Sequence, residues 1–328
     1  MPVQITIIGL GQIGASIGLA LAAHKDKVTT VGHDKEFSIE RLAQKNGIVD
    51  KTNHNLPSSV ENANLVVLAV PVHQMRETLG YIAQDLKKGT VVVDTTLVKG
   101  KVAKWAQEIL PKGVHYVGLV PAIGPDYLQE TKTGLDAAKA DLFSKAIFLL
   151  SAPYGTPGEA IELVSGFVSL TGGSVIITDL IESDGLMASA YLLPQLVSAA
   201  LLNATMEQPG WQEARKVASR VYFAATSALT GQEDTEALQM LTLHDRENVI
   251  HGLNAMILAL ADLRDDIEDV KEGSLKDRLK KAQEGRQNWL NERSTANWTE
   301  MKTVPVEKIS VKDRLFGTMF NRTDRKDK

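Results

Sequence analysis

Three glycines lie close together near the N-terminus, directly after an apolar stretch that is typical of a β-strand. Residues 5–21 place Gly9, Gly11 and Gly14 between that strand and an apolar helix. The first glycine permits a tight turn, the second lets the backbone approach a ligand, and the third lets the helix pack close to the strand. The first turn of the helix also offers unpaired N–H groups to an anion. The pattern therefore predicts a site for the diphosphate of a dinucleotide.

A carboxylate follows at the end of the second predicted strand, residues 28–32. Asp34 lies twenty residues after Gly14, the separation at which an acidic residue accepts hydrogen bonds from the adenosine ribose. Because this carboxylate would repel a 2′-phosphate, the sequence favours NAD, and Lys35 beside it leaves NADP open. The alternative is a glycine-rich turn in an α/β protein of another kind.

The residues expected to line the dinucleotide lie in the glycine turn and in the loops after the second, third and fourth predicted strands. Ligands of such sheets bind outside the carboxyl ends of the strands, which is why these loops are chosen. The expected cofactor-binding residues are Gly9, Gly11, Gln12, Ile13, Gly14, Asp34, Val70, Pro71 and Thr95.

Short apolar runs alternate with amphipathic stretches through residue 178, which predicts an α/β fold with a Rossmann-type, doubly wound parallel sheet. An all-α domain for dimerisation and substrate binding is expected over residues 179–295, followed by a basic tail over 296–328. The predicted strands after the second are 64–70, 90–94, 115–120, 146–151 and 174–178, and the predicted helices are 37–46, 74–86, 102–110, 158–170, 181–207, 211–230, 234–263 and 273–293. Pro194 lies inside the helix 181–207 and is expected to kink it.

Composition narrows the class of protein. The chain has 328 residues, a formal net charge of −4 and no cysteine, so we expect neither a nucleic-acid partner nor thiolate chemistry. We find no basic leader and no apolar run of about eighteen residues, so neither a membrane span nor export is expected and a cytoplasmic location is predicted. No group of His, Asp and Glu has metal-ligand spacing, so no metal site is expected.

Several further motifs make the chain similar to the prephenate/arogenate dehydrogenase family from residue 3 to roughly residue 295. The resemblance implies a Rossmann domain that binds NAD or NADP, a helical domain that forms a homodimer, and hydride transfer between a nicotinamide and a small substrate. The segments that carry it are the turn 9–16, Ala69-Val70-Pro71, Asp94 with Val98-Lys99-Gly100, Gly118 with Pro121 and Gly124, and residues 133–143.

The same motifs depart from the family where substrate chemistry is expected. The family's catalytic histidine, counted back from Pro121, corresponds to Val120, and its serine before Val-Lys-Gly corresponds to Leu97. A further family histidine, two residues before Pro194, corresponds to Leu192. Apolar side chains cannot accept the proton of an alcohol, a contribution of roughly 10²–10⁴ in rate. We therefore expect a substrate pocket that is more apolar than that of the family.

Three side chains are candidates for the missing proton donor or acceptor. Lys99 keeps its family position, and burial can lower the pKa of a lysine enough for acid or base chemistry. Thr96 offers a hydroxyl after the fourth predicted strand, and Tyr191 offers a phenol. The alternatives are a structural lysine, a hydroxyl that caps the next helix and a tyrosine packed in the core. His73 and His244 are more typical of an exposed loop and a solvated helix.

The sequence thus predicts a cytoplasmic, homodimeric NAD(P)-dependent oxidoreductase with a small-molecule substrate. A non-catalytic dinucleotide-binding sensor or scaffold is one alternative, and a prephenate or arogenate dehydrogenase proper is another. An imine or β-hydroxyacid reductase of similar architecture is a third. The sequence does not name the substrate or the direction of the reaction.

Overall fold

The computed structural model describes residues 2–130, 132–229, 234–296 and 298. Their contacts divide the chain into two units. In the described residues, the first unit comprises 2–184 with 234–241, and the second comprises 185–229 with 242–298. The basic tail predicted over 296–328 lies, apart from Ala296 and Trp298, outside the described residues.

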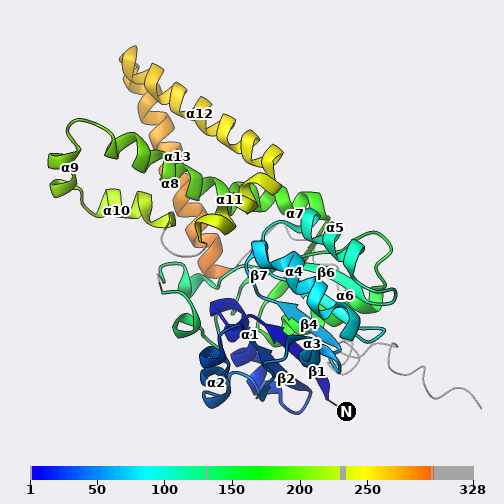
Figure 1. Ribbon diagram of the computed structural model, residues 1–328. Helices are drawn as coiled ribbons and strands as arrows, with labels where there is room; N and C mark the ends of the chain where they lie inside the picture. Colours follow the sequence, from blue (N-terminus) through cyan, green and yellow to red (C-terminus); the bar gives the residue numbers. More distant parts are fainter. Residues whose placement is uncertain (1, 131, 230–233, 297, 299–328) are drawn as a thin grey trace, which may run out of the picture. The chain divides into compact units, whose positions relative to one another are not determined.

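The first unit is built on an eight-stranded sheet with the order β3-β2-β1-β4-β5-β6-β7-β8 (Figure 1). All neighbouring strands are parallel except β6 and β7. The central strands are continuous runs of buried aliphatic residues, as expected of a parallel sheet covered on both faces. The strands are β1 (Val3–Ile8), β2 (Val28–His33), β3 (Lys51–Thr52), β4 (Leu65–Leu68), β5 (Val91–Asp94), β6 (His115–Pro121), β7 (Ile147–Ser151) and β8 (Ser174–Thr178).

Helices cover both faces of this sheet. Alternate residues of a strand point to opposite faces of the sheet. The residues on one face, among them Ile7 and Val67, pack with α1 and α6 in the main apolar core. The buried residues of α4 and α5 lie outside that cluster, and these two helices contact each other. The helices of the first unit are α1 (Gln12–Leu21), α2 (Phe37–Lys45), α3 (Leu56–Val60), α4 (Val72–Ile82), α5 (Lys99–Ile109) and α6 (Gly158–Leu170).

The predicted α/β fold is confirmed, with one reversal in its parallel sheet. In the described residues of the connection between β6 and β7, the only helical segments are short 3₁₀ turns, at Pro125–Tyr127 and Leu135–Ala137. A parallel strand needs a crossover that usually contains a helix, and without one β7 runs antiparallel to β6. Strand β3 and helix α3 were not predicted, because each is too short to show a hydrophobic period.

Helices form most of the described residues after the sheet (Figure 1). The predicted helix 211–230 is in fact two short helices, and the predicted helix 234–263 ends and restarts around Asp245. The helices are α7 (Leu180–Met187), α8 (Leu193–Met206), α9 (Trp211–Val217), α10 (Arg220–Thr226), α11 (Thr235–His244), α12 (Arg246–Glu268) and α13 (Glu272–Thr295).

The irregularity predicted at Pro194 takes the form of a π-helical segment. Five residues, Ala188–Leu192, join α7 to α8 with the wider π-helical turn, and Pro194 lies in the first turn of α8. Proline lacks an N–H and its ring crowds the preceding turn. A wider turn before the ring accommodates both effects.

This long helical stretch corrects one expectation. Leu180–Met206 is long and apolar enough, by length and composition alone, to cross a membrane, whereas the sequence was expected to hold no such stretch. The expectation counted uninterrupted apolar residues, but the interrupting Ser, Gly and Gln residues leave the mean hydropathy at 1.5. Core helices pass the same test, so the finding is weak evidence for a membrane.

Candidate functional site

The glycine turn has the geometry that its spacing predicts. Gly9 lies at the end of β1 with φ of +91°, a conformation that favours glycine. A Cβ atom on Gly14 would lie 1.9 Å from the carbonyl oxygen of Gly9, so α1 packs against the turn at a distance that only glycine allows. By contrast, a Cβ atom on Gly11 would meet no atom within 4 Å. Gly11 therefore faces an open cradle at the N-terminus of α1, where a diphosphate fits.

Asp34 is held beside this cradle by the backbone. Its Oδ2 atom accepts a hydrogen bond from the N–H of Leu10 at 2.8 Å, and its Oδ1 atom accepts one from the N–H of Glu36 at 3.0 Å. The residue is partly exposed, and each carboxylate oxygen keeps a further lone pair for a hydroxyl group. The pair of N–H contacts fixes the direction of the carboxylate, as recognition of a ribose requires.

The other predicted cofactor residues gather at the same edge of the sheet. Strands β1, β2, β4 and β5 are parallel, so their carboxyl ends meet there. A Cβ atom on Gly9 would lie 3.1 Å from Cγ1 of Val70, and Pro71 directly precedes α4. Thr95 follows β5, and its N–H donates to the carbonyl oxygen of Leu68 at 3.0 Å. Gln12 and Ile13 are half-buried in the first turn of α1.

Lys99 lies in a buried ion pair. Its side chain is 0% exposed, and its Nζ atom donates to Oδ1 of Asp94 at 2.7 Å and to the carbonyl oxygen of Asp94 at 3.1 Å. Burial lowers the pKa of Lys99, and the negative charge of Asp94 opposes that shift. This geometry supports the structural alternative for Lys99 that the sequence left open, because the ammonium group is bound inside the protein.

Tyr116 and Gly118 lie next to this ion pair. Tyr116 donates from its hydroxyl to Oδ2 of Asp94 at 2.6 Å. Burial first, and then the charge of Asp94, raise the pKa of Tyr116 well above its usual value. A Cβ atom on Gly118 would lie 2.6 Å from Cδ of Lys99, so Gly118 leaves the room that the lysine occupies. The motif positions 94, 99 and 118 therefore form one buried polar cluster.

The remaining candidates divide between the two units. The hydroxyl of Thr96 donates to Oδ1 of Asp94 at 2.5 Å, so Thr96 belongs to the same cluster. Leu97 and Val120, which stand at the family's polar positions, are 8% and 3% exposed. Tyr191 is half-buried in the π-helical segment of the second unit. Tyr191 belongs to the second unit, whereas Thr96, Leu97 and Val120 belong to the first.

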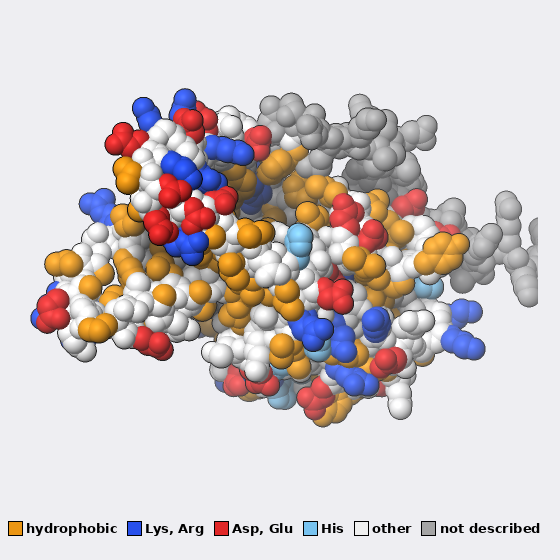
Figure 2. Space-filling model, turned by 90° about the horizontal axis from the view of Figure 1, so that it is seen from above, with side chains coloured by type: hydrophobic (Ala, Val, Ile, Leu, Met, Phe, Trp, Pro, Cys, Tyr) orange, Lys and Arg blue, Asp and Glu red, His pale blue; other side chains and the backbone are white. Residues whose placement is uncertain are grey.

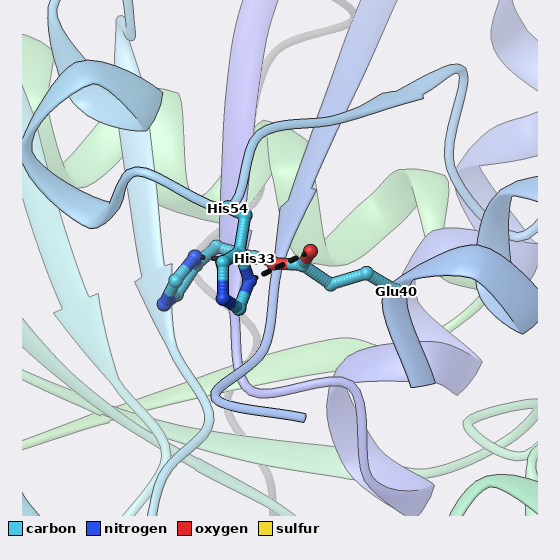
Figure 3. Close-up of side chains that lie close together, drawn as sticks. All are labelled: His33, Glu40 and His54. Atoms are coloured by element: carbon cyan, nitrogen blue, oxygen red, sulfur yellow. Dashed lines mark hydrogen bonds and ion pairs between the residues drawn. The ribbon is translucent and has the colours of Figure 1, made fainter. Parts of the chain in front are cut away.

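One polar cluster was missed by sequence reasoning. His33, Glu40 and His54 lie together beside Asp34, and Figure 3 shows the carboxylate of Glu40 reaching from α2 toward the two imidazole rings. Their spacing of seven and fourteen residues matches no metal motif. The signal lies in the pairing of β2 with β3, which the sequence did not reveal. His73, in contrast, contacts Gln74 through its Nε2 atom at 3.0 Å and holds a buried Nδ1 atom with no partner among the described residues.

Comparison with known proteins gives one family model, which matches within the first unit, and several curated relatives. Residues 17–177 match the family model of the prephenate dehydrogenase nucleotide-binding domain. Among curated proteins, cyclohexadienyl dehydrogenase of Zymomonas mobilis is 30% identical over 199 residues, which cover 61% of this chain and 66% of that protein. Prephenate dehydrogenase of Bacillus subtilis is 29% identical over 202 residues, 61% of this chain and 53% of that protein. The aligned part thus spans between about half and two thirds of these relatives.

Solved structures support the fold over a greater length. Prephenate dehydrogenase of Aquifex aeolicus, in complex with hydroxyphenyl propionate and NAD⁺, aligns with a TM-score of 0.77 at 23% identity, over 88% of this chain and 98% of that one. Arogenate dehydrogenase of Synechocystis aligns with a TM-score of 0.72 at 22% identity, over 87% and 99% of the two chains. At these identities the likeness shows the fold, including that of the helical part.

Proposed function

Since the chain resembles the prephenate and arogenate dehydrogenases, we propose that it is an NAD(P)-dependent oxidoreductase that transfers a hydride between a nicotinamide and a small substrate. The observation that carries the proposal is the open cradle at Gly11 with the fixed carboxylate of Asp34 beside it. The first turn of α1 would hold the diphosphate and Asp34 the adenosine ribose, which favours NAD over NADP. Bound there, the cofactor supplies the hydride chemistry.

Val70, Pro71 and Thr95 are proposed to continue the cofactor site toward the nicotinamide. Val70 and Pro71 follow β4, which is next to β1 in the sheet, and Thr95 follows β5, which is next to β4. Gln12 and Ile13 would contact the diphosphate from the first turn of α1. Gly9 and Gly14 shape the turn and need not touch the ligand.

Binding of NAD tests this part of the proposal. Gly11→Ala adds a methyl group to the cradle, where nothing lies within 4 Å, at a φ of −71° that alanine adopts without strain. The variant should keep its stability and lose at least about tenfold in affinity for NAD by isothermal titration calorimetry, because the methyl group displaces the diphosphate. Gly80→Ala, at another position where a Cβ atom meets nothing, is the matched control. Equal affinity of Gly11→Ala and the unchanged chain would contradict the proposed site.

The substrate is proposed to be less polar than prephenate. Leu97 and Val120 offer no hydrogen bond to a substrate hydroxyl, and a dianion needs paired cationic groups. We expect little or no prephenate-dependent formation of NADH by the purified chain, and turnover instead with an apolar carbonyl, alcohol or imine. Prephenate turnover at an ordinary enzymatic rate, about 1 s⁻¹ or more, would contradict the proposal of a less polar substrate and favour a prephenate dehydrogenase proper.

Among the three catalytic candidates, Tyr191 is proposed as the proton donor or acceptor. The side chains of Lys99 and Thr96 both donate to Asp94, which favours a positioning role for these two. Tyr191→Phe should lower the turnover number about 10²-fold or more and leave the affinity for NAD unchanged. If NAD binds but no carbonyl, alcohol or imine in a broad panel is turned over, the non-catalytic sensor replaces the enzyme as the better proposal.

A homodimer in the cytoplasm completes the proposal. Apolar side chains reach the surface of the helical unit (Figure 2), and half of the large exposed ones among the described residues lie on α10 and α12. Covering such a surface with a second copy of the chain lowers its exposure to water. The same covering would bury the apolar stretch Leu180–Met206 without a membrane.

A further inference from the structure

The cluster of His33, Glu40 and His54 lies at the end of the sheet where β2 and β3 pair. His33 is the last residue of β2, and Gly32 is in register with Thr52 of β3, two residues before His54. Glu40 enters from the first turn of α2. The ligand atoms of the three residues all lie within 4.8 Å of one another.

The carboxylate of Glu40 is buried without a lysine or arginine. It is 1% exposed, and its ion-pair partners among the described residues are the two histidines. Its Oε1 atom is 3.2 Å from Nδ1 of His33 and also accepts the N–H of Asp34 at 3.0 Å, and its Oε2 atom is 3.0 Å from Nδ1 of His54. A buried carboxylate needs a compensating charge or several hydrogen bonds. A divalent cation held between the carboxylate and the two histidines would supply such a charge.

From this arrangement we infer that His33, Glu40 and His54 bind a divalent transition-metal ion of the zinc type. Two His and one Glu are a ligand set that zinc uses where it keeps an open position. Ligands about 2.0–2.1 Å from a tetrahedral ion lie roughly 3.3–3.4 Å apart. The Nδ1 atom of His33 lies 3.2 Å from Oε1 of Glu40 and that of His54 lies 3.0 Å from Oε2, and one ligand atom from each residue lies within 4.8 Å of the other two. When the ion binds to the two Nδ1 atoms, each neutral imidazole would carry its single proton on Nε2.

The surroundings provide both support and access. The backbone oxygen of Asn53 lies 3.1 Å from Nδ1 of His33, the nitrogen that faces Glu40, so an ion bound at this nitrogen would take the place of the Asn53 contact. The ring of Phe37 packs edge-on against His54 at 5.5 Å and restricts the orientation of that imidazole. The side chain of His54 is 53% exposed, so the ion can enter from solvent on that side and keep a water molecule as its fourth ligand. The inference does not depend on the proposed dinucleotide site.

The test uses the full-length chain without a polyhistidine tag, titrated with Co²⁺ and Zn²⁺. We expect one ion per chain, visible absorption bands of four-coordinate Co²⁺ that Zn²⁺ abolishes, and a melting temperature that rises with Zn²⁺. His54→Gln should weaken binding at least about tenfold and remove the bands. This variant is decisive because its side chain is half-exposed, so the fold is kept where a change at buried Glu40 or His33 could lose it.

His251→Gln is the control, because His251 is an exposed histidine on α12. It should bind Co²⁺ as the unchanged chain does. The inference is overturned if the unchanged chain binds no ion, which leaves a hydrogen-bonded brace only. It is equally overturned if His54→Gln binds as tightly as the unchanged chain, or if His251→Gln loses the bands.

Discussion

Lys99 and Asp94 form a buried ion pair, which favours a supporting role for a lysine that its motif makes a catalytic candidate. Both side chains are fully buried and contact each other at 2.7 Å. Such a pair contributes little net stability compared with apolar residues, but removal of one partner leaves a charge without compensation. The motif in the sequence contains both Lys99 and Asp94, but it does not show that the two side chains form an ion pair.

Lys99→Met is therefore expected to lower the free energy of unfolding by about 3–5 kcal/mol, because Asp94 would remain buried and charged without its partner. Urea denaturation followed by circular dichroism measures the change. Lys104→Met, an exposed residue of the same helix, should change the stability by less than about 0.5 kcal/mol. A loss from Lys99→Met as small as the control would contradict the burial of the pair.

Tyr116 gives the same cluster a dependence on pH. Its pKa in the folded protein is raised well above 10.0 by burial and by Asp94, so the unfolded chain releases this proton first as the pH rises. The stability from Tyr116 is complete below about pH 10 and is lost above it, by up to about 1.4 kcal/mol per pH unit. The lowered pKa of Lys99 changes stability with pH in the opposite direction. The effect of Tyr116 is therefore measured against the variant Tyr116→Phe, which also contains Lys99.

The difference in unfolding free energy between the unchanged chain and Tyr116→Phe should thus shrink from pH 9 to pH 11. Denaturation at several pH values measures this difference directly. A difference that is constant with pH would mean that Tyr116 ionises in the folded protein as easily as in the unfolded chain.

Residues of the cofactor cradle were predictable, and those of the histidine cluster were not. Gly9, Gly14 and Asp34 act through local geometry, in which a turn and a fixed separation decide the contact. His33 and His54 meet only because β3 pairs with β2, and β3 has two residues. No periodic pattern can mark so short a strand.

Among the elements, the helix α5 begins with an unusual cap. Its own N-cap residue, Val98, has no side-chain hydrogen bond. The carboxylate of Asp184, in α7, accepts the N–H groups of Lys99 and Gly100 instead, the latter at 3.0 Å. A carboxylate at a helix N-terminus satisfies free N–H groups and faces the positive end of the helix dipole.

Asp184→Ala should consequently destabilise the protein by about 1–2 kcal/mol, in the range of a lost N-cap. The neighbouring exposed Glu182 offers the control Glu182→Ala, which should be nearly neutral. Thermal and urea unfolding of both variants measure the effect. Equal stability of the two would mean that solvent replaces the Asp184 carboxylate at no cost.

Helices and strands with a strong hydrophobic period were predicted well. The direction of β7 and the break of the helix at Asp245 were not predicted. The helix 158–170 and the strand 174–178 agree with α6 and β8 at both ends. The direction of β7 depends on the absence of a crossover helix in the preceding connection, a feature that apolar runs do not reveal. The break of the helix at Asp245 likewise interrupts an apolar pattern that continues on both sides.

For the whole molecule, the exposed apolar side chains of the helical unit favour self-association. On α12, Ile250, Ile257, Leu258 and Leu260 are all exposed. Leu258→Lys should weaken dimerisation at least about tenfold, because a charge would be buried at the interface, and sedimentation equilibrium would detect the monomer. Lys281→Glu, an exposed change on α13, is the control. An unchanged chain that is monomeric at micromolar concentration would contradict the proposed dimer.

The packing of Gly118 against Lys99 bears on how such a chain changes during evolution. A side chain at position 118 would collide with the lysine, so glycine is required there while Lys99 is present. Loss of the lysine would leave Asp94 without its ion-pair partner, so Lys99 and Asp94 depend on each other. Leu97 and Val120 lie within two residues of these positions on the same segments and carry no such constraint. Residues 97 and 120 can therefore change while the buried cluster that supports their segments is kept.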